Sequence, residues 1–399
     1  MVRFMNRSID ILEELAEHSG NIFHLNRRGY LYLTARPQSL DEFKTAAHVP
    51  SRLGAGSLRI HQGKSSDPHY QPHTPDGFRN APSGADLFLD PGSIQEHFPY
   101  LPAKICGALH VRRAGWLSAQ QLGMYMLEEA RARGVEFIRA RLTDVELTQG
   151  RIRSAVLLGD EDNREFKITM RNFVNAGGPK AHEINQLLGV TVPLQHELHL
   201  KTALRDRKGV VPRQAPLLIW NDPQVLPWTE EERRFLSREE DTRWLLEEMP
   251  SGAHTRPEGG SGSDIILLLW EYATQTMDPT FPPPMDEMYP EIALRGMAAM
   301  LPGFRKYFQR LPQPILDGGY YTKTPENRPL ITPLPVENAY LVGALSGYGI
   351  MGACAAGELA AAHITGSPLP SYAPAFHINR YQDPAYQALL QDWEGGGQL

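Results

Sequence analysis

The chain has 399 residues, enough for two domains, and its 41% hydrophobic and 22% charged residues are typical of a soluble globular protein. The net charge of −6, without a basic stripe, argues against nucleic-acid binding. Cys106 and Cys354 are too few for a disulfide scaffold, and acidic residues close to Met1 argue against a targeting peptide. A cytoplasmic location is therefore expected.

The chain opens with clear local signals. Apolar residues at helical spacing predict a helix over residues 6–20, with Asn6 or Ser8 as its N-cap and a stop at the glycine that ends it. Alternating polar and apolar residues in 21–35 then predict a β-hairpin with Gly29 near its turn.

The next segments differ sharply in regularity. Residues 39–49 predict a second helix with Ser39 as N-cap, whereas residues 54–84 are rich in Gly, Pro and His and predict a long surface loop. The segment 117–134 predicts an amphipathic helix that begins after Ser118 and ends at a glycine.

Short strands separated by turn signals dominate the middle of the chain. The strands are expected near residues 135–140, 141–150, 151–160, 164–178 and 264–272, and residues 216–228 belong to a region of long strands and proline-rich loops. A strand, a glycine pair and a helix follow one another in 173–189, and a further helix is expected in 289–301. No internal repeat is visible.

A glycine motif stands near the end of the chain. Gly347, Gly349 and Gly352 have the spacing G-x-G-x-x-G between the apolar run 339–345 and an alanine-rich helical stretch. A dinucleotide-binding turn needs a second parallel strand and an acidic residue about 20 positions further on. The following residues are broken by prolines and provide neither, so the motif fails as a Rossmann entry turn. Its glycines also interrupt the uncharged stretch, and no membrane span is expected.

The whole C-terminal third nevertheless resembles a known family. Thr324, Pro325 and Pro329, followed by a strand and the run 346–349 (Ser-Gly-Tyr-Gly), are similar to the flavin-contacting end of the FAD-dependent D-amino-acid oxidase superfamily. This group contains sarcosine oxidase, glycine oxidase and dimethylglycine dehydrogenase. The segments 115–147 and 173–184 resemble its middle section, so nearly the full chain is covered.

The resemblance implies a mixed α/β fold with an incomplete Rossmann-like FAD-binding domain and a substrate domain built on a mostly antiparallel sheet. It assigns residues 107–190 and 315–399 to the FAD-binding domain and residues 21–106 and 191–314 to the substrate domain. The family's own G-x-G-x-x-G unit lies ahead of the first helix and is absent from this sequence. An incomplete gene model, a spliced or degenerate product, and a domain completed by another chain are the explanations left open.

Glycine turns allow the backbone to approach a flat ring, and the last helix directs its N-terminal dipole towards the cofactor. The flavin contacts that the resemblance implies are Ala176, Gly177, Gly178, Gly347, Tyr348, Gly349, Ile350 and Met351, with the backbone of Val145 at the adenine. Either glycine turn alone would fit a plain tight turn beside a packed helix. Val145 would fit a core strand position equally well.

The resemblance also implies the chemistry, which is oxidation of a C–N bond in an amino acid or a secondary or tertiary amine. Gly319 stands where sarcosine oxidase attaches its flavin to a cysteine, so the FAD is expected to be non-covalent. Met351 replaces a lysine of that enzyme, and the expected strand 264–272 lacks the oxygen-activating lysine. Oxygen and another electron acceptor therefore both stay open.

Candidate catalytic residues are Tyr321, Arg328 and Arg256. Arg328 would suit a substrate carboxylate, or alternatively an ion pair with Glu326. His196 and His199 are expected on opposite faces of a strand, so no metal site is predicted. A non-catalytic family member that acts in assembly or as a scaffold is the alternative function.

Overall fold

The computed structural model describes residues 1–260, 262–391 and 393, and in this part of the chain nine strands form one large sheet. In spatial order they are β15 (Ile315–Lys323), β9 (Gln195–Arg205), β14 (Ile265–Leu269), β13 (Ala253–Pro257), β10 (Leu217–Trp220), β1 (Tyr30–Thr34), β4 (Gly107–Val111), β3 (Ala85–Phe88) and β2 (Leu58–His61). Neighbouring described strands are antiparallel except for the pairs β1–β10 and β2–β3. The predicted mixed fold with a mostly antiparallel sheet is confirmed.

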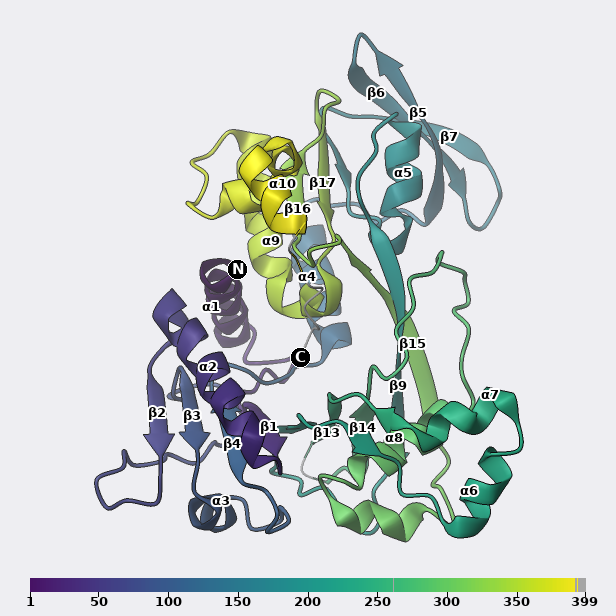
Figure 1. Ribbon diagram of the computed structural model, residues 1–399. Helices are drawn as coiled ribbons and strands as arrows, with labels where there is room; N and C mark the ends of the chain where they lie inside the picture. Colours follow the sequence, from purple (N-terminus) through teal and green to yellow (C-terminus); the bar gives the residue numbers. More distant parts are fainter. Residues whose placement is uncertain (261, 392, 394–399) are drawn as a thin grey trace.

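Two smaller sheets form a second body in the upper half of Figure 1. One contains β16 (Leu330–Pro333), β17 (Ala339–Gly343) and β8 (Phe173–Asn175), and the other β5 (Ala140–Thr148), β6 (Arg151–Gly159) and β7 (Glu165–Thr169). The long strands β9 and β15 run from the large sheet towards this body (Figure 1). Among the described residues β8 pairs only with β17, so its other edge has no strand partner.

Helices cover both bodies. They are α1 (Val2–His18), α2 (Leu40–Pro50), α3 (Pro91–His97), α4 (Ala119–Ala132), α5 (Ala181–Leu187), α6 (Glu230–Leu236), α7 (Glu240–Arg243), α8 (Tyr289–Met297), α9 (Gly349–Thr365) and α10 (Pro384–Gln391). A two-stranded sheet, β11 (Gln224–Val225) with β12 (Glu248–Met249), lies beside them. Helix α1 packs along α9, and together they stand between the two bodies (Figure 1).

The two faces of the large sheet differ in chemistry. Leu31, Leu218 and Leu268 point to the face covered by α8 and belong to the main hydrophobic core. Because side chains alternate along a strand, the ladder registers place the intervening residues on the opposite face. We call this the polar face and define it by Tyr30, His199, His254, Arg256 and Tyr321.

Several local predictions are confirmed. Helix α4 begins where the hydroxyl of Ser118 accepts a hydrogen bond from the Gln121 N–H, and Gly134 follows its end with φ +90°. Helix α2 follows Ser39 as expected, although the serine side chain makes no capping hydrogen bond. No helix in the described part of the chain combines the length and hydropathy that crossing a membrane requires.

Other predictions are wrong, for tertiary reasons. The first helix already begins at Val2, and the Ser8 hydroxyl accepts a hydrogen bond from the Ala355 N–H of α9 instead of capping α1. The hairpin over 21–35 is replaced by the single strand β1, whose partners β10 and β4 are distant in sequence. Gly29 lies beside it with φ +88°, because His110 and Val111 leave no room for a Cβ atom.

Two further differences concern strands. Residues 135–139, predicted to start a strand, have no strand partner among the described residues, and Val135, Phe137 and Ile138 are exposed. Conversely, β2 lies inside the predicted loop 54–84. The large sheet also takes β4 and β15 from segments assigned to the FAD-binding domain, and the domain division itself stays a prediction.

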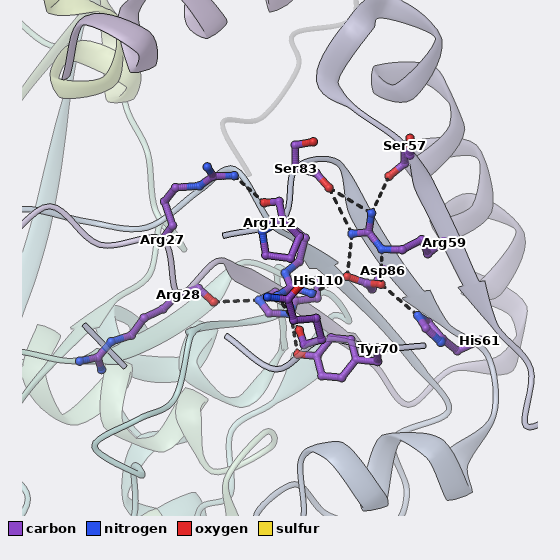
Figure 2. A network of polar contacts seen from close by, with 12 residues as sticks. Arg27, Arg28, Ser57, Arg59, His61, Tyr70, Ser83, Asp86, His110 and Arg112 are labelled. Carbon is purple, nitrogen blue, oxygen red and sulfur yellow. Dashed lines mark hydrogen bonds and ion pairs between the residues drawn. The ribbon is translucent and has the colours of Figure 1, made fainter. Parts of the chain in front are cut away.

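A buried ion-pair network holds β2, β3 and β4 together on the α8 side of the sheet (Figure 2). The fully buried Asp86 carboxylate accepts hydrogen bonds from Arg59 Nε at 2.7 Å and Arg112 Nη1 at 2.7 Å, and His61 Nε2 lies 3.0 Å away. Burial alone would raise the pKa of Asp86, yet the hydrogen bonds from His61, Arg59 and Arg112 hold it well below its usual range. Arg112 also donates to the Gln71 carbonyl, which fixes the covering loop.

Replacing Asp86 by alanine is expected to lower the free energy of unfolding by about 3–5 kcal/mol, because Arg112 would stay buried without its partner. Urea unfolding measures this loss. The control is Asp41→Ala, which removes an exposed pair with Lys44 and should leave the free energy of unfolding almost unchanged. Equal effects of the two substitutions would contradict the structural role of the network.

His110 predicts a pH dependence of stability. Its Nε2 donates to the Arg28 carbonyl at 2.8 Å and its Nδ1 accepts from the Tyr70 hydroxyl at 3.0 Å, so the buried ring is neutral. Burial, and then the charge of Arg112, lowers the pKa of His110 to about 3, against about 6.5 in the unfolded chain. The unfolded state therefore binds the proton first as pH falls. His110 should remove about 2 kcal/mol of stability between pH 7 and pH 5, and His110→Gln should lose this slope in urea unfolding.

Candidate functional site

The two predicted glycine turns lie at the same edge of one small sheet. Strands β8 and β17 pair in parallel, with Asn175 opposite Leu341. The carboxyl ends of parallel neighbours meet at one edge, where ligands of open α/β sheets bind. Residues 176–178 leave β8 at this edge, and residues 344–349 leave β17 beside them. The structure thus brings together two segments that are about 170 residues apart in the sequence.

The turn before α9 has strained backbone geometry. Ala344 and Ser346 both have positive φ, 54° and 51°, in a region that non-glycine residues rarely occupy. Such residues cluster at ligand clamps. Tyr348, the N-cap of α9, provides no side-chain cap, and a 3-10 turn over Ser346–Tyr348 leads directly into the helix. The dipole of the helix favours a ligand that carries negative charge at this end.

Strand β15 connects these turns to the polar face, because it contacts the short helical turns that follow β8 and β17. Gly319 and Tyr321 point to the polar face, and the ladder places Gly319 opposite His199 and Tyr321 opposite Glu197 of β9. The rings of Tyr321 and His199 are stacked, with centroids 3.7 Å apart and planes inclined by 22°.

Charged groups surround this stack. His199 Nδ1 lies 2.8 Å from a carboxylate oxygen of Glu271, at an angle outside the hydrogen-bond range, and Nε2 lies 3.4 Å from Glu197. Lys323 forms an ion pair with Glu197 at 2.6 Å. A buried histidine thus lies between two carboxylates, of which one already has a lysine partner.

Tyr321 and Tyr30 both point to the polar face. Burial raises the pKa of Tyr321 to about 12, with further contributions from Glu271 and from Tyr30. Tyr30 belongs to β1, and four strands separate β1 from β15 in the sheet.

Arg256 lies on the same face, next to Tyr30. Its Nη1 pairs with Glu258 at 2.5 Å, and its guanidinium group lies 4.9 Å from the ring centre of Trp116. Arg28 lies 5.1 Å from the same ring. Burial lowers the pKa of Arg256, which is typical of a cation removed from water. The predicted candidates Arg256 and Tyr321 therefore share one face of one sheet.

Arg328 lies elsewhere, on the segment after β15. Burial and then the charge of Arg328 lower the pKa of the Met1 amino group. Burial raises the pKa of the Tyr348 hydroxyl, and the charge of Arg328 opposes this rise, so Arg328 lies close to the start of α9. The alternative ion pair with Glu326 is wrong, since Glu326 pairs with Arg380 at 2.6 Å and accepts a hydrogen bond from the Tyr381 hydroxyl.

The remaining predicted contacts occupy different surroundings. Met351 lines an apolar cavity of about 250 Å³ between α1, α2 and the sheet, whereas Ile350 is about half exposed. The Val145 side chain packs with Ile152 in the core of the second body. That contact fits the core interpretation, and the adenine contact of its backbone stays a prediction.

The glycines at the edge offer a direct test of whether a flavin fits. A Cβ atom on Gly178 or Gly319 would meet nothing within 4 Å, and one on Gly349 would come no closer than 3.9 Å to another atom. At these positions no side chain obstructs the approach of a flat ring. Gly177 differs, because its Cβ would lie 2.6 Å from Ile184 Cδ1, so this glycine serves helix packing.

Sequence reasoning missed Glu271, His254 and Glu197. His199 was considered only as half of a metal pair with His196, and the structure confirms that these two histidines face opposite sides, since His196 bonds Thr322. The sequence does contain a signal for Glu197 and His199, namely the alternation of side chains along β9 and β15. Every second residue from Glu197 and from Gly319 points to the polar face.

Comparison with known proteins gives a consistent result. The model of the family described as FAD dependent oxidoreductase matches residues 1–363. The structure is similar to L-proline dehydrogenase from P. horikoshii (17% identity, TM-score 0.67), covering 95% of this chain and 83% of that one. It is also similar to iminodiacetate oxidase from Chelativorans sp. BNC1 (16%, 0.64, covering 94% and 82%) and to glycine oxidase from Geobacillus kaustophilus (15%, 0.65, covering 94% and 81%). At these identities the likeness shows the fold. No curated protein matches the chain.

One glycine of the site and one glycine outside it predict opposite stability effects. Gly177→Ala should lower the free energy of unfolding by about 1–3 kcal/mol, because the new methyl group overlaps Ile184. Gly357→Ala, in the interior of α9 with free space around it, should raise it by about 0.5–1 kcal/mol through helix propensity. Denaturant unfolding measures both, and stabilisation by Gly177→Ala would contradict the packing described.

Proposed function

The chain belongs to the FAD dependent oxidoreductase family, and on that premise we propose that it oxidises the C–N bond of an amino acid or of a secondary or tertiary amine with non-covalently bound FAD. The observation that carries the proposal is the convergence of the two turns, after β8 and after β17, at one edge that faces β15. The similar structures include a proline dehydrogenase, an iminodiacetate oxidase and a glycine oxidase, whose titles name substrates of this class.

In this proposal the two turns and Gly319 form the flavin-binding part of the site. The backbone of residues 347–351 at the start of α9 would hold the pyrimidine end of a bound flavin, and Ala176, Gly177 and Gly178 would let its phosphate or ribitol region approach β8. Gly319 carries no side chain, in agreement with a non-covalent cofactor. Bound FAD supplies the hydride acceptor, and the protein supplies orientation and charge.

The polar face binds the substrate. Arg256 is fixed by Trp116 and Glu258 and offers a guanidinium group to a substrate carboxylate. Tyr321, stacked on His199, forms the wall next to Gly319 and keeps water from the reacting carbon. Strand β14 carries no lysine, so an acceptor other than oxygen is at least as well supported as oxygen.

One observation favours the alternative, a non-catalytic family member that acts in assembly or as a scaffold. The outer edge of β8 has no strand partner among the described residues, and the Val174 side chain is about 41% exposed there. An open strand edge is a surface for pairing with another chain. Flavin binding distinguishes the two functions.

Titration of the purified chain with FAD, followed by quenching of flavin fluorescence, tests the proposal. Wild type should bind FAD and turn yellow, and Gly319→Leu should keep its fold but weaken binding at least tenfold, because its side chain would fill open space next to Tyr321. Gly357→Ala is the control that should bind like wild type. A folded, colourless wild-type protein without FAD binding would favour the assembly function.

A further inference from the structure

A row of polar side chains crosses the polar face from β13 to β15. Arg256 and His254 are two residues apart on β13, and His254 pairs with Leu269 of β14. Glu271 follows Leu269 by two residues on the same face, where it reaches His199 of β9. The row therefore runs from Arg256 through His254 and Glu271 to His199.

The two carboxylates next to His199 differ in their ion-pair partners. Glu197 has Lys323 as its partner at 2.6 Å. Glu271 has, among the described residues, only the His199 ring as an ion-pair partner and no hydrogen bond. Its negative charge is therefore unmatched whenever His199 is neutral. The Glu271 side chain is 31% exposed, whereas that of His199 is 7% exposed, so the carboxylate can reach a ligand that the ring cannot.

His254 adds a second acceptor. Its Nδ1 lies 2.7 Å from the Gly252 carbonyl oxygen, and because a carbonyl can only accept, Nδ1 is the donor. Burial lowers the pKa of His254 and favours the neutral ring. A neutral ring that donates from Nδ1 has an acceptor at Nε2.

We propose that Glu271, with His254 as a second acceptor, binds the positively charged amino group of the substrate. The inference rests on the proposed function and makes it more specific: the ligand is a protonated primary or secondary amine. The partly exposed Glu271 carboxylate, which has no ion-pair partner other than the His199 ring among the described residues, is complementary to the charge of such an amine.

Three small probes separate the two ends of the ligand. Pyrrolidine carries the ammonium group only, cyclopentanecarboxylate the carboxylate only, and L-proline both. Isothermal titration of the full chain, with and without FAD, is expected to show pyrrolidine binding by wild type and a loss of at least tenfold in Glu271→Gln. The affinity for L-proline should fall by a similar factor in this variant, whereas cyclopentanecarboxylate should bind with unchanged or higher affinity.

Asp264→Asn is the matched control, because it removes a carboxylate of the same sheet that pairs with Arg205 away from the row. It should bind all three probes like wild type, and thermal unfolding should show that both variants are folded. Equal pyrrolidine affinity in wild type and Glu271→Gln, or no pyrrolidine binding by wild type, would overturn the proposal. A separate measurement tests the proposed function itself: absence of FAD binding by the wild-type chain, in a titration without amine, would show that the proposed function fails.

Discussion

The parallel pairing of β8 with β17 is the constraint on which the site depends. Strand β8 has only three residues, yet its register with β17 sets where both following turns emerge. A shift by one residue would turn every side chain to the other face and move one turn away from the other. The fully buried Asn175 fixes the turn after β8, because its side chain bonds both the Ala181 carbonyl and the Gly177 N–H.

The second element of the site is the long ribbon of β9 and β15. It belongs to the large sheet at one end and reaches the second body at the other, so the residues on its polar face lie between sheet and turns (Figure 1). Strands β1 and β13 contribute Tyr30, His254 and Arg256 to the same face. The Asp86 network (Figure 2) and the main core occupy the α8 side of the sheet, whereas the candidate binding groups occupy the polar face.

Local signals in the sequence predicted those parts whose causes are local. The helix after Ser118 and the strand–turn–helix of 339–365 follow from caps, glycines and apolar spacing within a few residues. The partner of β1 lies almost 190 residues away, and no local pattern specifies that it is β10 or that the pairing is parallel. The hairpin was predicted because alternation reports a half-buried strand without identifying its neighbour.

The site residues also fall into two groups, those with a local sequence signal and those that only distant strand pairing brings together. The glycine turns carried a recognisable pattern, whereas Glu271 gained its significance only when the β14–β9 register placed it next to His199. Residues 135–138 show the opposite case, since their apolar side chains predicted a strand for which the described residues provide no partner.

Hydrogen–deuterium exchange of the full chain with and without FAD tests the central claim most directly, namely that the two turns and β15 form one cofactor site. The structure predicts that FAD protects residues 176–180, 344–352 and 319–323 together. Protection of only one of these segments, or protection confined to the α8 side of the sheet, would contradict it.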